Sequence, residues 1–157
     1  MDALFKPHIE ILEILIRKEV NFMLIGGYSV IHYGYKRGTN DMDIWLQPEN
    51  KNKLKLTEAM REYGLRKSEV QKILDLDFTK AQAFFLGEDP ARVDFVTNIQ
   101  SVTWNEAIPN VRFIQTGALM IPVIGYHDLI RTKISSRRLK DLADVEELQK
   151  INRNRNN

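Results

Sequence analysis

The sequence predicts an α+β fold, with a mixed β-sheet flanked by helices and a helical C-terminal end. Three features support this class. In the first half of the chain, segments with helical periodicity alternate with short apolar runs of strand length. Two later pairs of apolar runs surround glycine-containing turns, which is typical of β-hairpins. After Gly125 the periodicity is helical again, so we expect the chain to close with helices packed on the sheet.

In residues 7–20 apolar side chains recur at helical spacing with charged side chains opposite, which predicts an amphipathic helix. The apolar run 22–25 is too short for a helix and ends at two glycines, so we expect a buried strand. Residues 28–33 then form a short helix that ends before a glycine. The alternating stretch 41–46 predicts a strand, and residues 50–63 predict a helix capped by a glycine.

The second half of the chain contains two predicted hairpins. Residues 81–86 and 92–96 predict strands paired around a Gly-Glu-Asp-Pro turn. Residues 111–114 and 120–124 predict strands paired around Gly117. Beyond them, leucine, isoleucine and valine side chains at helical spacing predict two final helices.

The chain of 157 residues is expected to form a single domain over residues 1–151, with a frayed tail at 152–157. Hydrophobic residues make up 43% and charged residues 28%, which is an ordinary globular composition. No apolar run is long enough to span a membrane, and the N-terminus lacks the pattern of a signal peptide. We therefore predict a cytoplasmic protein without a membrane partner.

Composition and spacing exclude several familiar chemistries. The absence of cysteine excludes disulfides, thiolate metal sites and a cysteine nucleophile. The sequence has no phosphate loop, no dinucleotide-binding glycine pattern and no Gly-x-Ser-x-Gly elbow. Its three histidines are scattered and form no metal-ligand pair. The sequence therefore disfavours a Ser-His-Asp hydrolase and a histidine-bound zinc enzyme.

The formal net charge of +2 is too small to indicate nucleic-acid binding by itself. The basic excess lies near the C-terminal end, because residues 131–155 contain eight Lys or Arg and four Asp or Glu. This asymmetry fits a protein that holds metal ions with one part and phosphates with another. A solvated helix face explains it equally well.

The candidate chemistry lies in a group of aspartates. Asp41 and Asp43 stand two apart on a predicted strand, so both point to one face with Cα atoms about 6–7 Å apart. A divalent cation would offset their repulsion, and magnesium prefers oxygen ligands. Asp94 is the single acid in a later apolar strand, and three aspartates on neighbouring strands could hold two metal ions. For an isolated Asp-x-Asp, a turn or a surface strand is the simpler interpretation.

The residues before this pair favour a phosphate site. Gly26 and Gly27 follow a strand and open a short helix, where a triphosphate could approach exposed backbone N–H groups. Lys36, Arg37 and Thr39 supply two cations and a hydroxyl suited to phosphate oxygens.

The stretch 24–44 resembles the signature of the nucleotidyltransferase superfamily that includes DNA polymerase beta. A hydrophobic residue and Gly-Gly are followed, after about a dozen residues, by Asp-hydrophobic-Asp-hydrophobic. Arg-x-Thr-x-Asp is typical of the small bacterial members, and Asp94 matches the third carboxylate. Residues 120–144 are similar to the C-terminal signature of AbiEii-type and minimal nucleotidyltransferases. The resemblance covers residues 21–148 and implies a nucleotidyltransferase-like core without the appended acceptor domain of larger members.

The resemblance and the chemistry imply roles for these residues. Asp41 and Asp43 would bind the metal ion that holds the phosphates. Asp94 would bind a second metal ion or accept the proton of the acceptor hydroxyl. A solvated helix face is the alternative for each lysine on the C-terminal helices. The predicted contacts to the nucleotide are Gly26, Gly27, Arg37, Thr39, Lys133 and, second to it, Lys140.

Three further residues have predicted roles outside the phosphate site. Asp141 and Asp144 share one helical face and are expected to hold their helix through a basic partner such as Arg137, with a fourth catalytic role less favoured. Trp45 shares the strand face of the aspartates, where it would stack on a base or, more commonly, pack in the core.

The predicted function is that of a minimal nucleotidyltransferase. It would transfer a nucleoside monophosphate from a nucleoside triphosphate to an acceptor, with Mg²⁺ or Mn²⁺ and release of pyrophosphate. The acceptor could be a small molecule, a transfer RNA or a protein side chain, and toxin–antitoxin members of the family suggest a partner protein. Two alternatives are a non-catalytic module of the same fold that binds nucleotide or a toxin, and a structural domain with coincidental aspartates.

Overall fold

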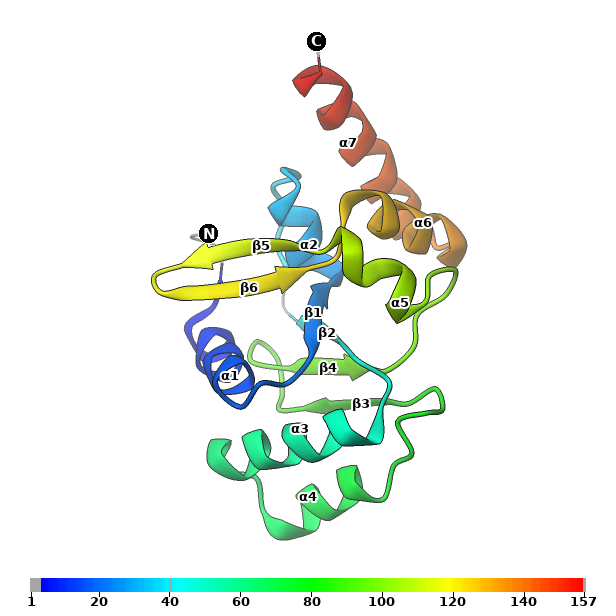
Figure 1. Cartoon of the computed structure of the whole chain (residues 1–157). Coiled ribbons are helices and arrows are strands. Elements are labelled where there is room, and N and C mark those ends of the chain that lie inside the picture. The colour runs from blue at the N-terminus through cyan, green and yellow to red at the C-terminus, as the bar shows by residue number, and fades with distance from the viewer. Residues whose placement is uncertain (1–3, 40, 157) are drawn as a thin grey trace.

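The computed structural model describes residues 4–39 and 41–156. In this part of the chain six strands form one mixed sheet with the order β3-β4-β2-β1-β6-β5, and helices pack around it (Figure 1). The α+β class expected from the sequence is confirmed. The strands are β1 (Phe22–Ile25), β2 (Met42–Leu46), β3 (Ala83–Leu86), β4 (Val93–Val96), β5 (Arg112–Thr116) and β6 (Leu119–Val123). The helices are α1 (Lys6–Arg17), α2 (Gly26–His32), α3 (Asn50–Tyr63), α4 (Lys67–Leu74), α5 (Trp104–Ala107), the 3-10 helix η1 (Ile108–Asn110), α6 (Tyr126–Ser136) and α7 (Leu139–Arg155).

The centre of the sheet joins strands from distant parts of the chain. β1 pairs antiparallel with β2 and parallel with β6, and β2 pairs parallel with β4. The predicted hairpins, β3–β4 and β5–β6, extend the sheet to its two edges. The register places Ile25, Asp43, Asp94 and Phe85 side by side across four strands. Two aspartates therefore lie next to each other between two apolar residues.

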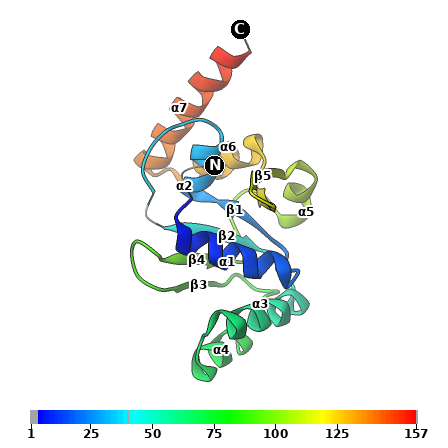
Figure 2. The same ribbon diagram turned by 90° about the vertical axis from the view of Figure 1, so that its left-hand side faces the viewer.

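The helices surround the sheet in separate groups. α3 and α4 lie near the β3 edge, and α6 and α7 lie toward the opposite end (Figure 1). α1 lies in front of β1 and β2 when the molecule is turned (Figure 2). α7 projects away from the sheet and carries the C-terminus at its far end (Figures 1 and 2).

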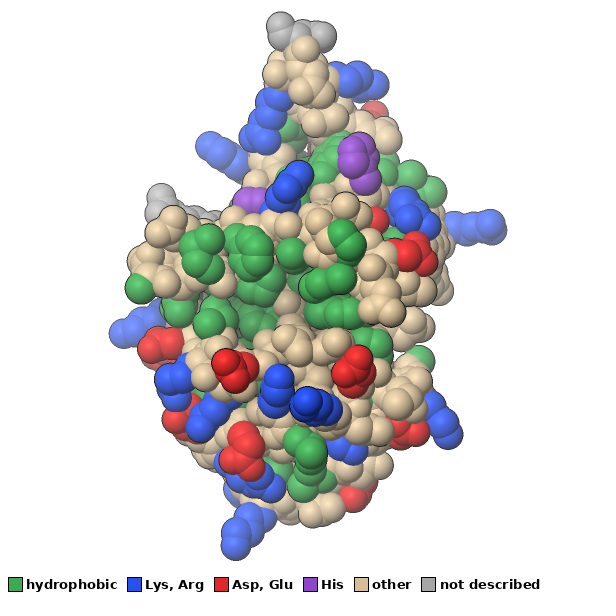
Figure 3. All heavy atoms as spheres, in the orientation of Figure 1, with side chains coloured by type: hydrophobic (Ala, Val, Ile, Leu, Met, Phe, Trp, Pro, Cys, Tyr) green, Lys and Arg blue, Asp and Glu red, His purple; other side chains and the backbone are tan. Residues whose placement is uncertain are grey.

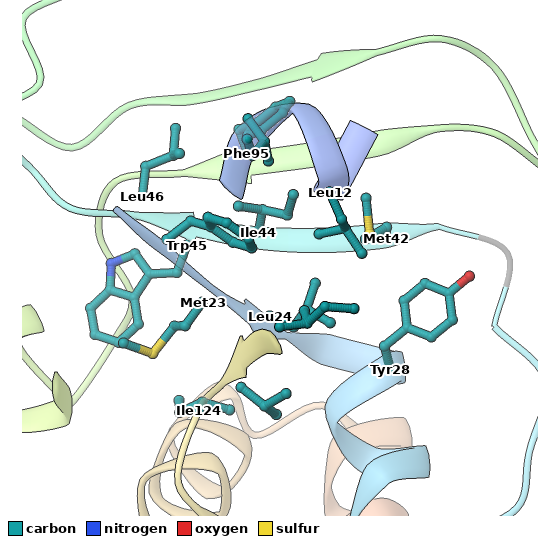
Figure 4. Close-up of a cluster of buried hydrophobic side chains, with 14 of the residues drawn as sticks. Leu12, Met23, Leu24, Tyr28, Met42, Ile44, Trp45, Leu46, Phe95 and Ile124 are labelled. Atoms are coloured by element: carbon teal, nitrogen blue, oxygen red, sulfur yellow. The ribbon is translucent and has the colours of Figure 1, made fainter. Parts of the chain in front are cut away.

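Apolar side chains from α1 and the central strands form the core (Figure 4). Alternate residues of β2, which are Met42, Ile44 and Leu46, are fully buried. Trp45 is also buried. Its one polar group is satisfied there, because the indole Nε1 donates a hydrogen bond of 3.1 Å to the carbonyl oxygen of Thr97. Burial of a side chain of this size contributes about 1.5–3 kcal/mol. Of the two predicted roles for Trp45, the structure supports packing in the core.

Two short helices in the middle of the chain were not predicted from the sequence. α4 buries only Val70 and Ile73. α5 is a single turn, which Thr103 caps by accepting a hydrogen bond from the backbone N–H of Glu106. Both segments are too short to give a clear periodic pattern of apolar residues.

The C-terminal helix is longer than predicted. We expected a frayed tail from residue 152, whereas α7 continues through Arg155. Asn157 lies outside the described residues. The side chains of Ile151 and Arg155 pack over Gly34, which has no Cβ and adopts a φ of +109°. This contact with a distant segment holds the last turns of α7, and a local pattern could not have predicted it.

A buried hydrogen-bond network ties α1 to α2 and to the start of β4. His8 is fully buried, and its Nδ1 lies 2.7 Å from the hydroxyl oxygen of Tyr28. Its Nε2 donates toward the carbonyl oxygen of Arg92 at 3.2 Å when that nitrogen carries the proton. Burial lowers the pKa of His8 below its ordinary value of 6.5, although the backbone carbonyls partly oppose this effect.

The lowered pKa of His8 predicts a pH-dependent stability. Below pH 6.5 the unfolded chain binds a proton at His8 more readily than the folded protein does, so the contribution of His8 to the free energy of unfolding should fall as the pH falls. The raised pKa values of Asp41 and Asp43 act in the opposite direction. Urea unfolding at a series of pH values between 5 and 8 measures how the free energy of unfolding depends on pH. His8→Gln should remove the contribution of His8, so that relative to the wild type the free energy of unfolding decreases less, or increases more, from pH 7 to pH 5. An unchanged pH dependence in this variant would contradict the assignment to His8.

Candidate active site

Three predicted carboxylates gather at the ends of two neighbouring strands. Asp43 on β2 and Asp94 on β4 are directly paired across a parallel register, so their side chains leave the same face of the sheet. Asp41 lies just before β2, two residues from Asp43, and therefore points the same way. The parallel pairing of β2 with β4 thus places the three aspartates on one face of the sheet, as the sequence predicts.

The electrostatics of this group are unfavourable for three ionised carboxylates. Burial and then the charges of Asp94 and Asp41 raise the pKa of Asp43 to about 6, although Lys133 and Lys140 oppose the shift. A hydrogen bond with Asp89, burial and the charges of Asp89 and Asp94 raise the pKa of Asp41 above its ordinary value. The cations nearby, which are Lys133 and Lys140 for Asp43 and Arg92 for Asp41, therefore offset only part of the burial and of the repulsion between carboxylates.

Asp89 was missed as a candidate by the sequence analysis, which treated it only as part of a turn. It lies between β3 and β4, and the hydrogen bond with Asp41 places its side chain next to the carboxylate group. Only the folding of the β3–β4 turn toward the start of β2 brings them together. No local signal in the sequence could have revealed this contact.

Asp94 is not free in the structure, because Arg92 holds its carboxylate. Nη2 of Arg92 donates to Oδ1 of Asp94 at 2.9 Å, and Nε lies 3.2 and 3.3 Å from its two oxygens. The guanidinium also stacks on Phe85, with its central carbon 4.0 Å from the ring centroid. Arg92 stands two residues before Asp94, and this spacing on one strand face was a signal that the sequence analysis did not use.

The cluster formed by Asp41, Asp43 and Asp94 is only partly arranged to bind a divalent cation. Oδ1 of Asp41 is buried and has no hydrogen-bond partner, and hard cations such as Mg²⁺ take carboxylate oxygens as ligands. The raised pKa of Asp43 also shows that a nearby positive charge would be favourable. Among the described residues, however, no three Asp, Glu or His side chains already converge as a metal site. Asp41 and Asp43 fit such an ion, and Asp94 would join them once its ion pair with Arg92 opened.

The predicted glycine turn packs directly against the aspartates. Gly26 begins α2 with a φ of +65°, and a Cβ on it would overlap the carboxylate of Asp43. A Cβ on Gly27 would overlap the hydroxyl of Thr39. That hydroxyl donates a hydrogen bond of 3.1 Å to the carbonyl oxygen of Asp41. Both glycines are therefore required for the loop before β2 to approach α2 this closely.

Two cavities meet at Asp43. One has a volume of about 480 Å³ and also contains Gly26 and Lys133. The other has a volume of about 400 Å³ and is lined by the remaining predicted phosphate contacts. Volumes of this size are typical of small-ligand sites. Asp94 lines neither cavity. The second cavity brings together Gly27, Arg37, Thr39 and Lys140 with Asp41 and Asp43.

A buried ion cluster connects α6, α7 and the loop before β2. Nζ of Lys133 lies 3.2 Å from Oδ1 of Asp141 and 3.0 Å from Oδ2 of Asp144. Arg37 reaches Asp144 as well, with Nη2 and Nε each 3.1 Å from a carboxylate oxygen. Lys133 therefore lines a cavity beside Asp43, but two carboxylates already balance its charge.

The prediction that Arg137 holds Asp141 and Asp144 was wrong. Among the described residues no ion pair involves Arg137, which adopts a left-handed conformation between α6 and α7. Asp141 is held by Arg138 at 2.8 Å and by the hydroxyl of Ser136 at 2.6 Å in addition to Lys133. Burial would raise the pKa of Asp141, but the hydrogen bond from Ser136 and the cation Lys133 together lower it.

The ion cluster predicts a large effect of Asp144→Asn on stability. The change leaves Lys133 and Arg37, which are largely buried, without one of their carboxylate partners. The free energy of unfolding should fall by about 3 kcal/mol, as measured by urea denaturation. Glu146→Gln on the exposed face of the same helix is the control and should change it by less than about 0.5 kcal/mol. Equal effects of both changes would show that the cluster does not stabilise the fold.

Comparisons with known proteins agree with this architecture. The chain is similar to a candidate nucleotidyltransferase from Thermotoga maritima, with 18% identity and a TM-score of 0.54 over 90% of this chain and 87% of that one. It is also similar to the lincosamide antibiotic adenylyltransferase LnuA in its lincomycin-bound form, with 15% identity and a TM-score of 0.55. That match covers 95% of this chain and 98% of LnuA. At these identities the likeness shows the fold alone.

Sequence comparison places the chain more specifically. No protein of curated function matches it. The profile of the family described as "Nucleotidyl transferase of unknown function (DUF2204)" matches residues 5–157, a span that includes the glycine turn and all three aspartates. The chain belongs to this family of nucleotidyl transferases.

Proposed function

We propose that this protein transfers a nucleoside monophosphate from a nucleoside triphosphate to an acceptor hydroxyl, with release of pyrophosphate and with Mg²⁺ or Mn²⁺ as cofactor. The observation that carries the proposal is the position of Asp41 and Asp43. They are carboxylates with raised pKa values, and both line the cavity that contains the glycine turn, Arg37 and Lys140. Membership of the nucleotidyl transferase family supports the same class of reaction.

The cavity of about 400 Å³ is the proposed triphosphate site. Gly27 lines this cavity beside the hydroxyl of Thr39, and Lys140 lies on α7 at the cavity wall without an ion-pair partner among the described residues. Lys140 is therefore better placed than Lys133 to neutralise phosphate charge, which reverses their expected order. Arg37 and Thr39 would contact phosphate while remaining held by Asp144 and by the backbone of Asp41.

The transfer step requires one proton acceptor and one leaving group. The oxygen of the acceptor hydroxyl forms a bond to the α-phosphorus, and the bond from that phosphorus to the bridging oxygen of pyrophosphate breaks. A bound divalent ion would supply charge stabilisation for the phosphates, with Asp41 and Asp43 as its ligands. In this proposal Asp94 accepts the hydroxyl proton or binds a second ion after Arg92 releases it.

The acceptor class stays open among a small molecule, a transfer RNA and a protein side chain. LnuA is an antibiotic adenylyltransferase bound to lincomycin, which makes a small-molecule hydroxyl one candidate. The AbiEii-type relationship, a toxin–antitoxin partner and a cytoplasmic location also stay predictions. None of the helices in the described part of the chain is long and apolar enough to cross a membrane.

A non-catalytic nucleotide- or toxin-binding module is the second candidate. It is favoured by the ion pair between Arg92 and Asp94, which occupies one of the three carboxylates that a two-metal site would use. In a binding module this ion pair would persist when nucleotide and metal are present. Measurements of binding and of transfer therefore distinguish the two candidates.

The first test concerns Asp43→Asn. Without metal this change removes carboxylate repulsion, so the free energy of unfolding should hold or rise by up to about 3 kcal/mol, which corresponds to raising a pKa from 3.8 to about 6. The increase in Tm that nucleoside triphosphate with Mg²⁺ or Mn²⁺ gives the wild type should be lost. Thermal unfolding with and without ligand measures both effects. Asp75→Asn, an exposed change of the same charge at the end of α4 and outside both cavities, should retain the increase.

A wild type that gains no thermal stability from any triphosphate with either metal would contradict the proposed nucleotide site. A less stable Asp43→Asn protein in the absence of metal would indicate a purely structural Asp43.

The second test asks directly for transfer. The protein is incubated with each α-³²P-labelled nucleoside triphosphate, Mg²⁺ and a cell extract, and the labelled products are separated into RNA, protein and small molecules. We expect one class to become labelled, and Asp43→Asn to reduce the rate by orders of magnitude because metal-held charge stabilisation is lost. Stabilisation by a triphosphate without any labelling in the wild type would favour the binding module.

A further inference from the structure

A separate cavity lies outside the proposed active site. The active site contacts the start of α2, the end of α6 and the start of α7, whereas the separate cavity contacts the opposite end of each of these helices. Its volume is about 350 Å³, and its walls include Tyr33 after α2, Tyr126 and His127 at the start of α6, and Arg155 at the end of α7. The active-site cavities instead contact the first turn of α7, around Asp141. From Asp141 to Arg155 the axis of α7 rises about 21 Å. None of the residues with a proposed catalytic role lines this separate cavity.

Two arginines give the separate cavity a positive charge. Arg112 comes from β5 and Arg155 from α7, and among the described residues neither has a carboxylate partner. Asp128, a buried acid on α6, accepts a hydrogen bond of 3.2 Å from Asn110 and lies 3.9 Å from Arg131. Figure 3 shows Lys or Arg and His side chains gathered around a hollow at the base of α7.

Aromatic rings form another wall of the separate cavity. Tyr33 and Tyr126 pack edge to face with ring centroids 5.5 Å apart, and His127 packs on Tyr126 at 5.3 Å. The hydroxyl of Tyr33 donates to the carbonyl of Ile124 at 2.7 Å, and that of Tyr126 donates to Leu148 at 3.2 Å. These bonds fix the rings in place and use their polar groups. What the two tyrosines can offer a ligand is therefore their ring surface.

We propose that the separate cavity binds the phosphate of a nucleotide between Arg112 and Arg155, with the base against the ring wall. The nucleotide is either free or part of a single RNA strand. Guanidinium groups form charge-assisted hydrogen bonds with phosphate, and ring surfaces stack on any base. The volume is within the range of small-ligand pockets. This second site does not depend on the proposed transfer reaction, because it shares no residue with the metal and triphosphate site.

The test measures binding in metal-free buffer, where a site that needs a divalent ion does not contribute. The probes are a short fluorescein-labelled single-stranded RNA, followed by anisotropy, with AMP and inorganic phosphate as competitors. Arg112→Gln/Arg155→Gln should weaken RNA binding by about tenfold for each arginine. The slope of log K against log salt should become less steep by about 0.7 for each. Arg17→Gln/Arg61→Gln, which removes the same charge from exposed ion pairs on α1 and α3, should have little effect.

A further variant tests the ring wall. His127 is exposed, so His127→Ala should not disturb the fold, and it should weaken RNA binding several-fold while leaving competition by inorganic phosphate unchanged. Competition by AMP at concentrations similar to those of RNA supports a free nucleotide, and competition by RNA alone supports a strand. Inorganic phosphate that competes as well as AMP overturns the proposal, and so does equal binding by the two double variants.

Failure of this proposal can be distinguished from failure of the proposed function. Arg112→Gln/Arg155→Gln should keep the increase in Tm that triphosphate and Mg²⁺ produce. Asp43→Asn should lose that increase and keep the metal-free binding of RNA. Loss of both properties in the same variant would show that there is one site and would overturn the assignment of a second.

Discussion

Two negative charges lie side by side in the middle of the sheet, because β2 and β4 pair with Asp43 opposite Asp94. Apolar residues flank them on both neighbouring strands, so neither burial nor the register relieves their repulsion. The surrounding structure supplies positive charge from several directions. Arg92 reaches Asp94 from the same strand, while Lys133 and Lys140 act on Asp43 from α6 and α7. Asp41 feels the charge of Arg92 but forms no ion pair with any described residue, and among these residues its Oδ1 has no hydrogen-bond partner.

The position of α7 beside the aspartates is held by the buried ion cluster. Asp144 binds both Lys133 of α6 and Arg37 of the loop before β2, so one carboxylate fixes three segments beside the cavities. Because the cluster is buried, the desolvation of its charges offsets most of their attraction, and its net contribution to the free energy of unfolding is small. Removing one member costs more, because it leaves a buried charge without its partner. Its structural consequence is a defined orientation for α7. Lys140 and the first turn of that helix thereby face the proposed triphosphate site, while Arg155 reaches the separate cavity at the other end.

Close packing beside the carboxylates explains why residues 26 and 27 are both glycine. Asp43 fills the space that a side chain on Gly26 would occupy, and Thr39 does the same for Gly27. The side chains of Asp43 and Thr39 are thus the groups packed directly against the backbone of the turn. A phosphate group entering this corner would meet backbone and carboxylate oxygens together. Such a mixture of charges is stable only with a cation between them, which is the physical basis for expecting a metal-bound nucleotide.

The sequence by itself determined the spacing of the local elements and the identity of the reactive groups. Alternation in residues 41–46 placed Asp41 and Asp43 on one face of their strand. The apolar neighbours of Asp94 likewise placed this single acid on the polar face of its own strand. These inferences depend only on the geometry of a strand. They hold because neighbouring residues on one strand cannot change their relative direction.

Contacts between distant segments were decided only by the tertiary structure. Whether Asp94 faces Asp43 depends on the parallel pairing of β2 with β4, and the contact of Asp89 with Asp41 depends on how a turn folds. The sequence predicts Lys133 as a phosphate contact, but the tertiary structure places Asp141 and Asp144 beside it, where they balance its charge. The extension of α7 to Arg155 depends on packing over Gly34. The physical reason is common to all of them: charge balance and close packing are set by neighbours in space, whereas periodicity reports only neighbours along the chain.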